Sequence, residues 1–123
     1  LVVQGSMSVP SVTPFHCAGL VSSIGTIIKS RGTHAFTVTK VGTGIYDITF
    51  GSEHPDGINY VVTTDSFSDS AWGTYIDSHF QRRWSTVVRI TTRATNSGTK
   101  TDSESTFCVL ASSIFLPKTK AIN

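Results

Sequence analysis

A chain of 123 residues and 13.2 kDa is long enough to bury one core and short enough for a single domain. Charged residues make up only 15 %, whereas there are 18 Thr and 17 Ser, and Val, Ile and Thr total 40, so the composition favours strands over helices. The net charge of +2 is too small for a nucleic-acid-binding protein, and two cysteines are too few for a disulfide scaffold. The sequence has no run of 18 apolar residues, which excludes a membrane-spanning helix.

Residues 1–14 differ from the rest of the chain. Their apolar and small side chains fall at alternate positions, and two prolines, Pro10 and Pro14, interrupt them. Proline cannot donate a main-chain hydrogen bond, so a central strand is excluded there. The segment also lacks the basic start of a signal peptide. We expect residues 1–14 to form an extended, shaft-like lead-in, a linker or a frayed terminus, and residues 15–123 to form the domain.

Short β-rich runs, separated by turn residues, follow from Phe15 onward. Residues 45–50 show the pattern most clearly, because Tyr46, Ile48 and Phe50 share one face of a strand. The other runs in the first half of the chain lie at 15–21, 26–30 and 34–41.

The segment His54-Pro55-Asp56-Gly57 predicts a β-turn, since proline sets the first central φ angle and glycine accepts a positive one. This turn connects the strand at 45–50 to a strand expected at 58–64. The later strands are expected at 74–80, 85–93 and 106–112. Eight short strands with turn signals between them predict an antiparallel β-sandwich or barrel.

The strand predicted at 85–93 has two different faces. Val88 and Ile90 share an apolar face, whereas Arg89 and Arg93 lie on the opposite, mixed face. The mixed face of such a strand can pack against a neighbouring subunit, which is our hypothesis for it.

Several of these runs, in order, resemble a domain found at the distal ends of bacteriophage and other viral fibre proteins. The motifs include an aromatic-x-Cys-Ala-Gly-x-Val opening at 15–21, a Gly-x-Tyr-x-Ile-Thr-Phe strand at 44–50 and a His-Pro-x-Gly turn at 54–57. The remaining matching segments are 30–32, 32–39, 54–61 and 102–110. The stretch VQGSMSVPS also resembles the last repeat of a fibre shaft.

This resemblance implies a jelly-roll-like antiparallel β-sandwich of about eight strands, similar to the heads of the C1q and tumour-necrosis-factor type. It implies the C-terminal head of a homotrimeric tail fibre, made in the host cytoplasm and carried at the fibre tip of the virion. The implied role is host attachment through a surface polysaccharide or protein receptor, without catalysis, cofactor, nucleic acid or membrane insertion.

The segment 66–84 is the richest in aromatic residues, and Tyr, Trp and Arg dominate binding hot spots. Aromatic faces also stack on sugar rings. The candidate receptor-binding residues are Trp72, Tyr75, Asp77, Arg82, Arg83 and Trp84. The alternative is structural, because Trp72, Ile76 and Phe80 share one parity and can fill the core or a subunit interface.

Metal binding and catalysis have little support in the sequence. The four histidines form no metal-binding motif, although three copies of His16 near a trimer axis could hold one ion. Cys17 and Cys108 lie on strands that neighbour each other in a jelly roll, so they are buried thiols, a disulfide or a reactive nucleophile, although no His and acid are visibly paired with either. We therefore expect no metal, no cofactor and no catalytic residue.

Three other functions compete with receptor binding. The domain can be a purely structural cap that trimerises the fibre shaft. It can be a small polysaccharide-degrading enzyme, although no paired carboxylates are visible at a fixed spacing. A secreted C1q-like signalling domain is the last alternative.

Overall fold

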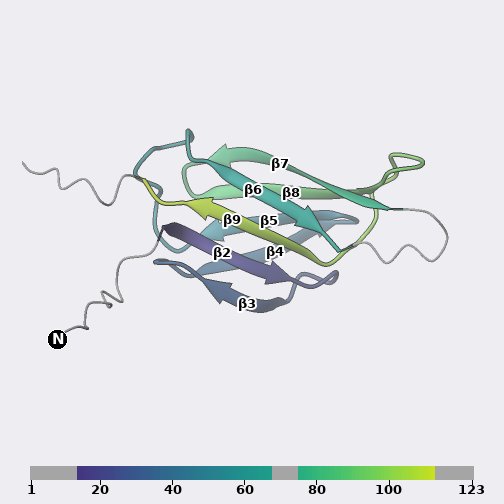
Figure 1. Cartoon of the computed structure of the whole chain (residues 1–123), viewed down its shortest axis with the longest axis horizontal. Helices are drawn as coiled ribbons and strands as arrows, with labels where there is room; N and C mark the ends of the chain where they lie inside the picture. Colours follow the sequence, from purple (N-terminus) through teal and green to yellow (C-terminus); the bar gives the residue numbers. More distant parts are fainter. Residues whose placement is uncertain (1–13, 68–74, 113–123) are drawn as a thin grey trace, which may run out of the picture.

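The computed structural model describes residues 14–67 and 75–112 as two stacked four-stranded antiparallel sheets, with no helix in these ranges (Figure 1). The first sheet has the strand order β3 (Ile27–Arg31), β2 (Phe15–Val21), β9 (Ser105–Leu110) and β6 (Val62–Ser66). The second has the order β4 (Phe36–Gly42), β5 (Ile45–Phe50), β8 (Val87–Ala94) and β7 (Ile76–Trp84). The predicted all-β sandwich of eight strands is confirmed. The lead-in expected at 1–14 lies outside the described residues, apart from Pro14.

The chain builds the sandwich by alternating hairpins with crossings between the sheets. β2 pairs with β3, β4 with β5 and β7 with β8, whereas each intervening connection passes to the other sheet. β9 returns to lie between β2 and β6, so the first and last strands of the domain are hydrogen-bonded neighbours. β6 and β7 are edge strands of different sheets, and they lie side by side without main-chain pairing (Figure 1).

The core lies between the two sheets and follows from the period of two in the sequence. Along β8, buried Val88, Ile90 and Thr92 alternate with half-buried residues, as predicted from the sequence. The rings of Phe36 and Phe107, from opposite sheets, meet edge to face with centroids 4.8 Å apart. Each fully buried apolar side chain of this size contributes about 1.5–3 kcal/mol to folding.

The predicted turn at 54–57 forms, but β6 starts later than the sequence pattern indicated. The Gly57 amide donates to the His54 carbonyl over 3.0 Å, and Gly57 has a φ of 66°. The Asn59 amide then donates to the Asp56 carbonyl, so the chain keeps turning beyond the tetrapeptide. The strand expected at 58–64 is therefore wrong in its first residues, and β6 occupies Val62–Ser66.

The two cysteines are free thiols on opposite faces of the first sheet. Cys17 is paired in register with Val109 and is fully buried, whereas Cys108 is paired with Ala18 and is half-buried. Opposed residues on paired strands point to the same face and successive residues alternate, so the two side chains point away from each other. The disulfide alternative is thereby excluded, although the predicted adjacency of the two strands is confirmed.

The thiols should differ in reactivity. Burial, followed by the nearby Cys108, raises the pKa of Cys17 to about 12, so its reactive thiolate is scarce at neutral pH. We expect iodoacetamide to label Cys108 in the folded single chain, diluted below any self-association, and to label Cys17 only after unfolding. Peptide mass spectrometry checks this, and equal native labelling of both residues would contradict the placement of Cys17 in the core.

Candidate functional site

Most of the predicted receptor-binding residues lie on or beside β7, the edge strand of the second sheet. β7 pairs with β8 on one side only, and six of its nine residues are exposed. An open strand edge presents both its side chains and its main-chain polar groups to a partner. β7 therefore offers a long surface for contact.

The structure divides the candidate residues into two groups instead of one site. Trp72 lies outside the described residues. The other five are Tyr75 and Asp77 at the start of β7, and Arg82, Arg83 and Trp84 at its end. A strand rises about 3.3 Å per residue, so Tyr75 and Trp84 lie roughly 30 Å apart. A single small ligand cannot contact both groups.

The group at the end of β7 is held from inside the sandwich by Tyr60. The buried Tyr60 hydroxyl donates to the Trp84 and Val87 carbonyls, at 3.0 and 2.8 Å, and the Arg82 side chain donates to the Tyr60 carbonyl over 3.2 Å. The Arg83 guanidinium lies 4.8 Å from the centre of the Trp84 ring. The main chain is thus fixed, while 55 % of the Trp84 surface stays exposed.

A shallow groove runs between β6 and β7 near the middle of β7. It has a volume of about 440 Å³ and is lined by Thr63, Thr64, Ser78, His79 and Phe80. Phe80 is 44 % exposed, so the structure contradicts its expected place in the core of the subunit. An aromatic ring beside several hydroxyl groups is the composition that binds the apolar face and the hydroxyls of a sugar.

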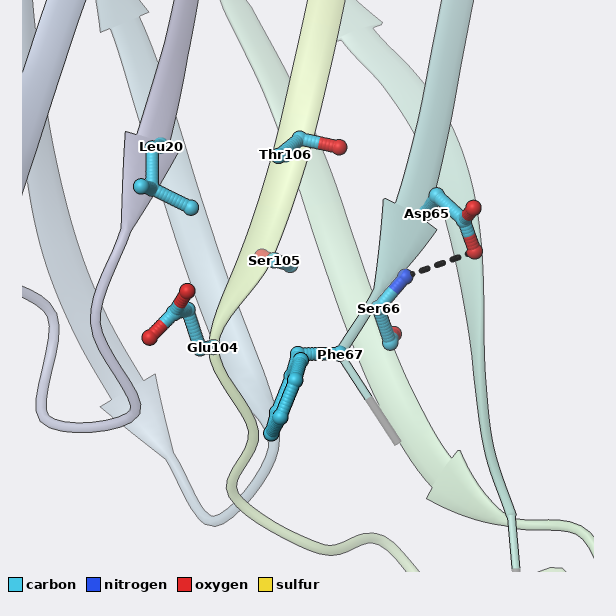
Figure 2. Close-up of a pocket in the computed structure, with 7 residues that line it drawn as sticks. All are labelled: Leu20, Asp65, Ser66, Phe67, Glu104, Ser105 and Thr106. Atoms are coloured by element: carbon cyan, nitrogen blue, oxygen red, sulfur yellow. Dashed lines mark hydrogen bonds between the residues drawn. The ribbon is translucent and has the colours of Figure 1, made fainter. Parts of the chain in front are cut away.

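A second hollow, the acidic pocket, lies at the ends of β6 and β9 (Figure 2). Its volume is about 230 Å³. The residues that line it are Leu20, Asp65, Ser66, Phe67, Glu104, Ser105 and Thr106. One Asp65 oxygen accepts the Ser66 amide at 2.8 Å, and the Ser66 hydroxyl is buried with no hydrogen-bond partner in the described part of the chain. Phe67 is 62 % exposed.

Sequence reasoning missed this pocket, because Glu104 lies in a polar connection far along the chain from Asp65.

Three histidines pack together at the end of the sandwich where β2 begins. The ring centre of His16 lies 4.5 Å from that of His34 and 4.6 Å from that of His54. His16 and His54 are buried, and their Nε2 atoms bond the carbonyls of Ser52 and Leu110 at 2.8 and 2.7 Å. The Asp56 amide donates to His54 Nδ1, so both ring nitrogens of His54 have hydrogen-bond partners.

This packing argues against a metal role for His16. Its ring faces His34, His54 and Phe50 inside the sandwich, and it is 3 % exposed. Three copies of a buried ring cannot meet at an axis outside the domain, so that alternative is wrong. No group of three His, Cys, Asp or Glu side chains suited to a metal ion occurs in residues 14–67 and 75–112.

Comparison of the chain with family models, with curated proteins and with solved structures finds no match. Within the described ranges, no helix is long and apolar enough to cross a membrane.

Proposed function

We propose that this chain is the non-catalytic head domain of a viral fibre, of the kind that tailed bacteriophages carry, and that it attaches the virion to a host cell. It acts as a homotrimer at the fibre tip. Its partner is a surface polysaccharide or a protein receptor of the host. The observation that carries this proposal is the row of exposed aromatic side chains along the open edge of β7.

Three large aromatic side chains on or beside one edge strand stay open to solvent. Tyr75 is 58 %, Phe80 44 % and Trp84 55 % exposed. They are spread along roughly 30 Å of the strand, and register places Phe80 opposite inward-facing Ile90 but Trp84 opposite outward-facing Val87. Exposed aromatic side chains are typical of binding surfaces, in which Tyr, Trp and Arg supply most of the energy. The hydroxyl-lined groove beside Phe80 adds hydrogen-bonding groups that suit a saccharide. Three copies per fibre raise the strength of weak single-site contacts by avidity.

Replacing Phe80 and Trp84 together by alanine tests this surface. We expect the binding of the labelled chain to whole bacterial cells, screened as a panel of strains, to weaken by roughly a hundredfold, since a hot-spot side chain costs about 1–2 kcal/mol when truncated. The thermal stability should change little, because both side chains are largely exposed. The variant Thr37→Ala with Thr39→Ala, on exposed positions of the opposite edge strand β4, is the matched control and should bind like the wild type.

The same experiment separates attachment from a purely structural role. If the wild-type chain binds a strain and the β7 variant binds it equally well, this surface does not contact the receptor. If no strain is bound while the chain still associates with itself, the structural cap becomes the better account.

A further inference from the structure

The outer face of the first sheet has an apolar centre. Register places Phe15 opposite Leu110, and Ala18 opposite Cys108, on the side of the sheet that faces away from the core. Val61 extends the first of these rows, since the Leu110 amide donates to its carbonyl. Leu110 and Val61 are 39 % and 55 % exposed, whereas Ala18 is buried, so this apolar centre is open at its Leu110 and Val61 end in the single chain.

Opposite charges flank this centre on the two edges of the same face. One cross-strand row reads Lys29, Leu20, Thr106 and Asp65, from β3 to β6. The next row begins at Arg31, opposite Ala18. Lys29 and Asp65 are three strand spacings apart, about 14 Å, so they cannot pair within one chain. We call Lys29 and Arg31 the basic edge, and it lies across the sheet from the acidic pocket.

Two charged residues in the middle of the second sheet pair with each other. Arg89 donates two hydrogen bonds to Asp47, at 2.8 and 3.1 Å, in the middle of its outer face. Lys40 likewise lies 3.1 Å from Asp102. On the first sheet, the ion pairs found in the described ranges include none of Lys29, Arg31, Asp65 and Glu104. The second sheet is similar near its β7 edge, since Asp77, Arg82, Arg83 and Arg93 are also in none of these pairs.

The acidic pocket fits a long basic side chain. Asp65 and Glu104 supply carboxylates, and the buried Ser66 hydroxyl has no hydrogen-bond partner among residues 14–67 and 75–112 (Figure 2). Leu20 and Phe67 supply apolar walls, against which the aliphatic stem of Arg or Lys packs well. Figure 2 shows the two carboxylates on opposite sides of the hollow. A guanidinium group carries five N–H donors in one plane and can bond one of these carboxylates through two parallel hydrogen bonds.

We propose that the outer face of the first sheet is the contact between copies of this chain, in which the basic edge of one copy enters the acidic pocket of the next. Charge complementarity identifies the occupant as a second copy, because the face that carries the pocket also carries the basic edge that fits it. The contact joins two different patches, and such a contact gives a closed ring when the rotation from one copy to the next closes, as in a trimer. This inference rests on the proposed homotrimer and names the surface that builds it.

Charge reversal tests the contact by sedimentation equilibrium of the whole chain. Lys29→Glu with Arg31→Glu, and separately Asp65→Lys with Glu104→Lys, should each weaken association by roughly a hundredfold, because like charges then face each other. The quadruple variant, which exchanges the two signs, should recover most of the association. Arg93→Glu with Lys100→Glu makes the same change of charge at β8 and the residue that bridges to it, and should leave association unchanged. A loss of association in this variant would overturn the proposed contact in favour of the mixed face with Arg89 and Arg93. Circular dichroism checks that every variant is folded.

The outcomes separate this contact from the rest of the account. A wild-type chain that associates while both reversals associate equally well overturns the proposed contact but leaves the homotrimer standing, and the basic edge then serves only to protect β3 against aggregation. A wild-type chain that stays monomeric overturns the contact and the homotrimer together. Binding to bacterial cells is measured separately and reports on attachment alone.

Discussion

Replacement of His54 by alanine is expected to lower the free energy of unfolding by about 3 kcal/mol. The His54 ring is 1 % exposed, and its two nitrogens bond the Leu110 carbonyl and the Asp56 amide. Alanine removes both of these hydrogen bonds and opens a cavity beside His16 and Tyr60. The turn that begins at His54 also loses its side-chain bond. Urea denaturation of the wild type and the variant at pH 8 measures the difference.

A control substitution at an exposed histidine shows whether the burial of His54 is the reason for the expected loss of stability. His79 is exposed on β7, and His79→Ala should change stability by less than about 0.5 kcal/mol. A His54→Ala variant whose stability stays within 1 kcal/mol of the wild type would contradict the structural role of this ring.

Stability is also expected to fall as the pH drops below about 6.5, through His16. Burial lowers the pKa of His16 from its usual 6.5; the bond to the Ser52 carbonyl opposes this shift, and the neighbouring His54 and His34 add to it. The folded chain then holds His16 neutral at a pH where the unfolded chain binds a proton. Its contribution is therefore complete above pH 6.5 and is lost as the pH falls toward the lowered folded pKa, at a slope of at most about 1.4 kcal/mol per pH unit for one proton.

The variant His16→Gln isolates this dependence. Glutamine can keep a donor to the Ser52 carbonyl but binds no proton in this range. Urea denaturation between pH 8 and pH 5 should give a flatter profile for His16→Gln than for the wild type, whereas His79→Gln should keep the wild-type slope. Parallel profiles for His16→Gln and the wild type would show that acid acts through another group.

The strand pattern could be predicted from the sequence where one face of a strand is fully buried. β5 has the predicted bounds, because Tyr46, Ile48 and Phe50 all face the core. β7 extends to Trp84, beyond the predicted end at residue 80, because its polar residues still pair with β8 through the main chain. The alternation of apolar and polar residues cannot indicate where such an exposed edge strand ends, because neither of its faces is fully buried.

Several residues that carry the fibre-head resemblance have structural roles that the sequence alone did not reveal. The Gly44 amide donates to Asp102 over 2.7 Å, across 58 positions, and the Tyr46 hydroxyl donates to the Ser23 carbonyl. Gly44 has a φ of 68°, and a Cβ there would lie 2.6 Å from the Thr92 carbonyl oxygen, so only glycine fits. The resemblance therefore rests largely on residues that build the fold, and the binding surface has to be argued separately.

The candidate site was harder to predict because it depends on distance in space. Tyr75 and Trp84 are near in sequence, yet an extended strand separates them by roughly 30 Å. Conversely, Asp65 and Glu104 are far apart in sequence, and the pairing of β6 with β9 places them around one pocket. The three histidines come from separate segments and meet only when the two sheets stack.

The most direct test of the proposed attachment function is to expose the labelled chain to an immobilised array of bacterial surface polysaccharides, while assaying the released reducing ends. The account predicts saturable binding to a subset of the polysaccharides, with no reducing ends released. Release of reducing ends from a bound polysaccharide would show a degrading enzyme and contradict the non-catalytic role. The absence of binding to every polysaccharide and to every strain of the cell panel would contradict attachment itself.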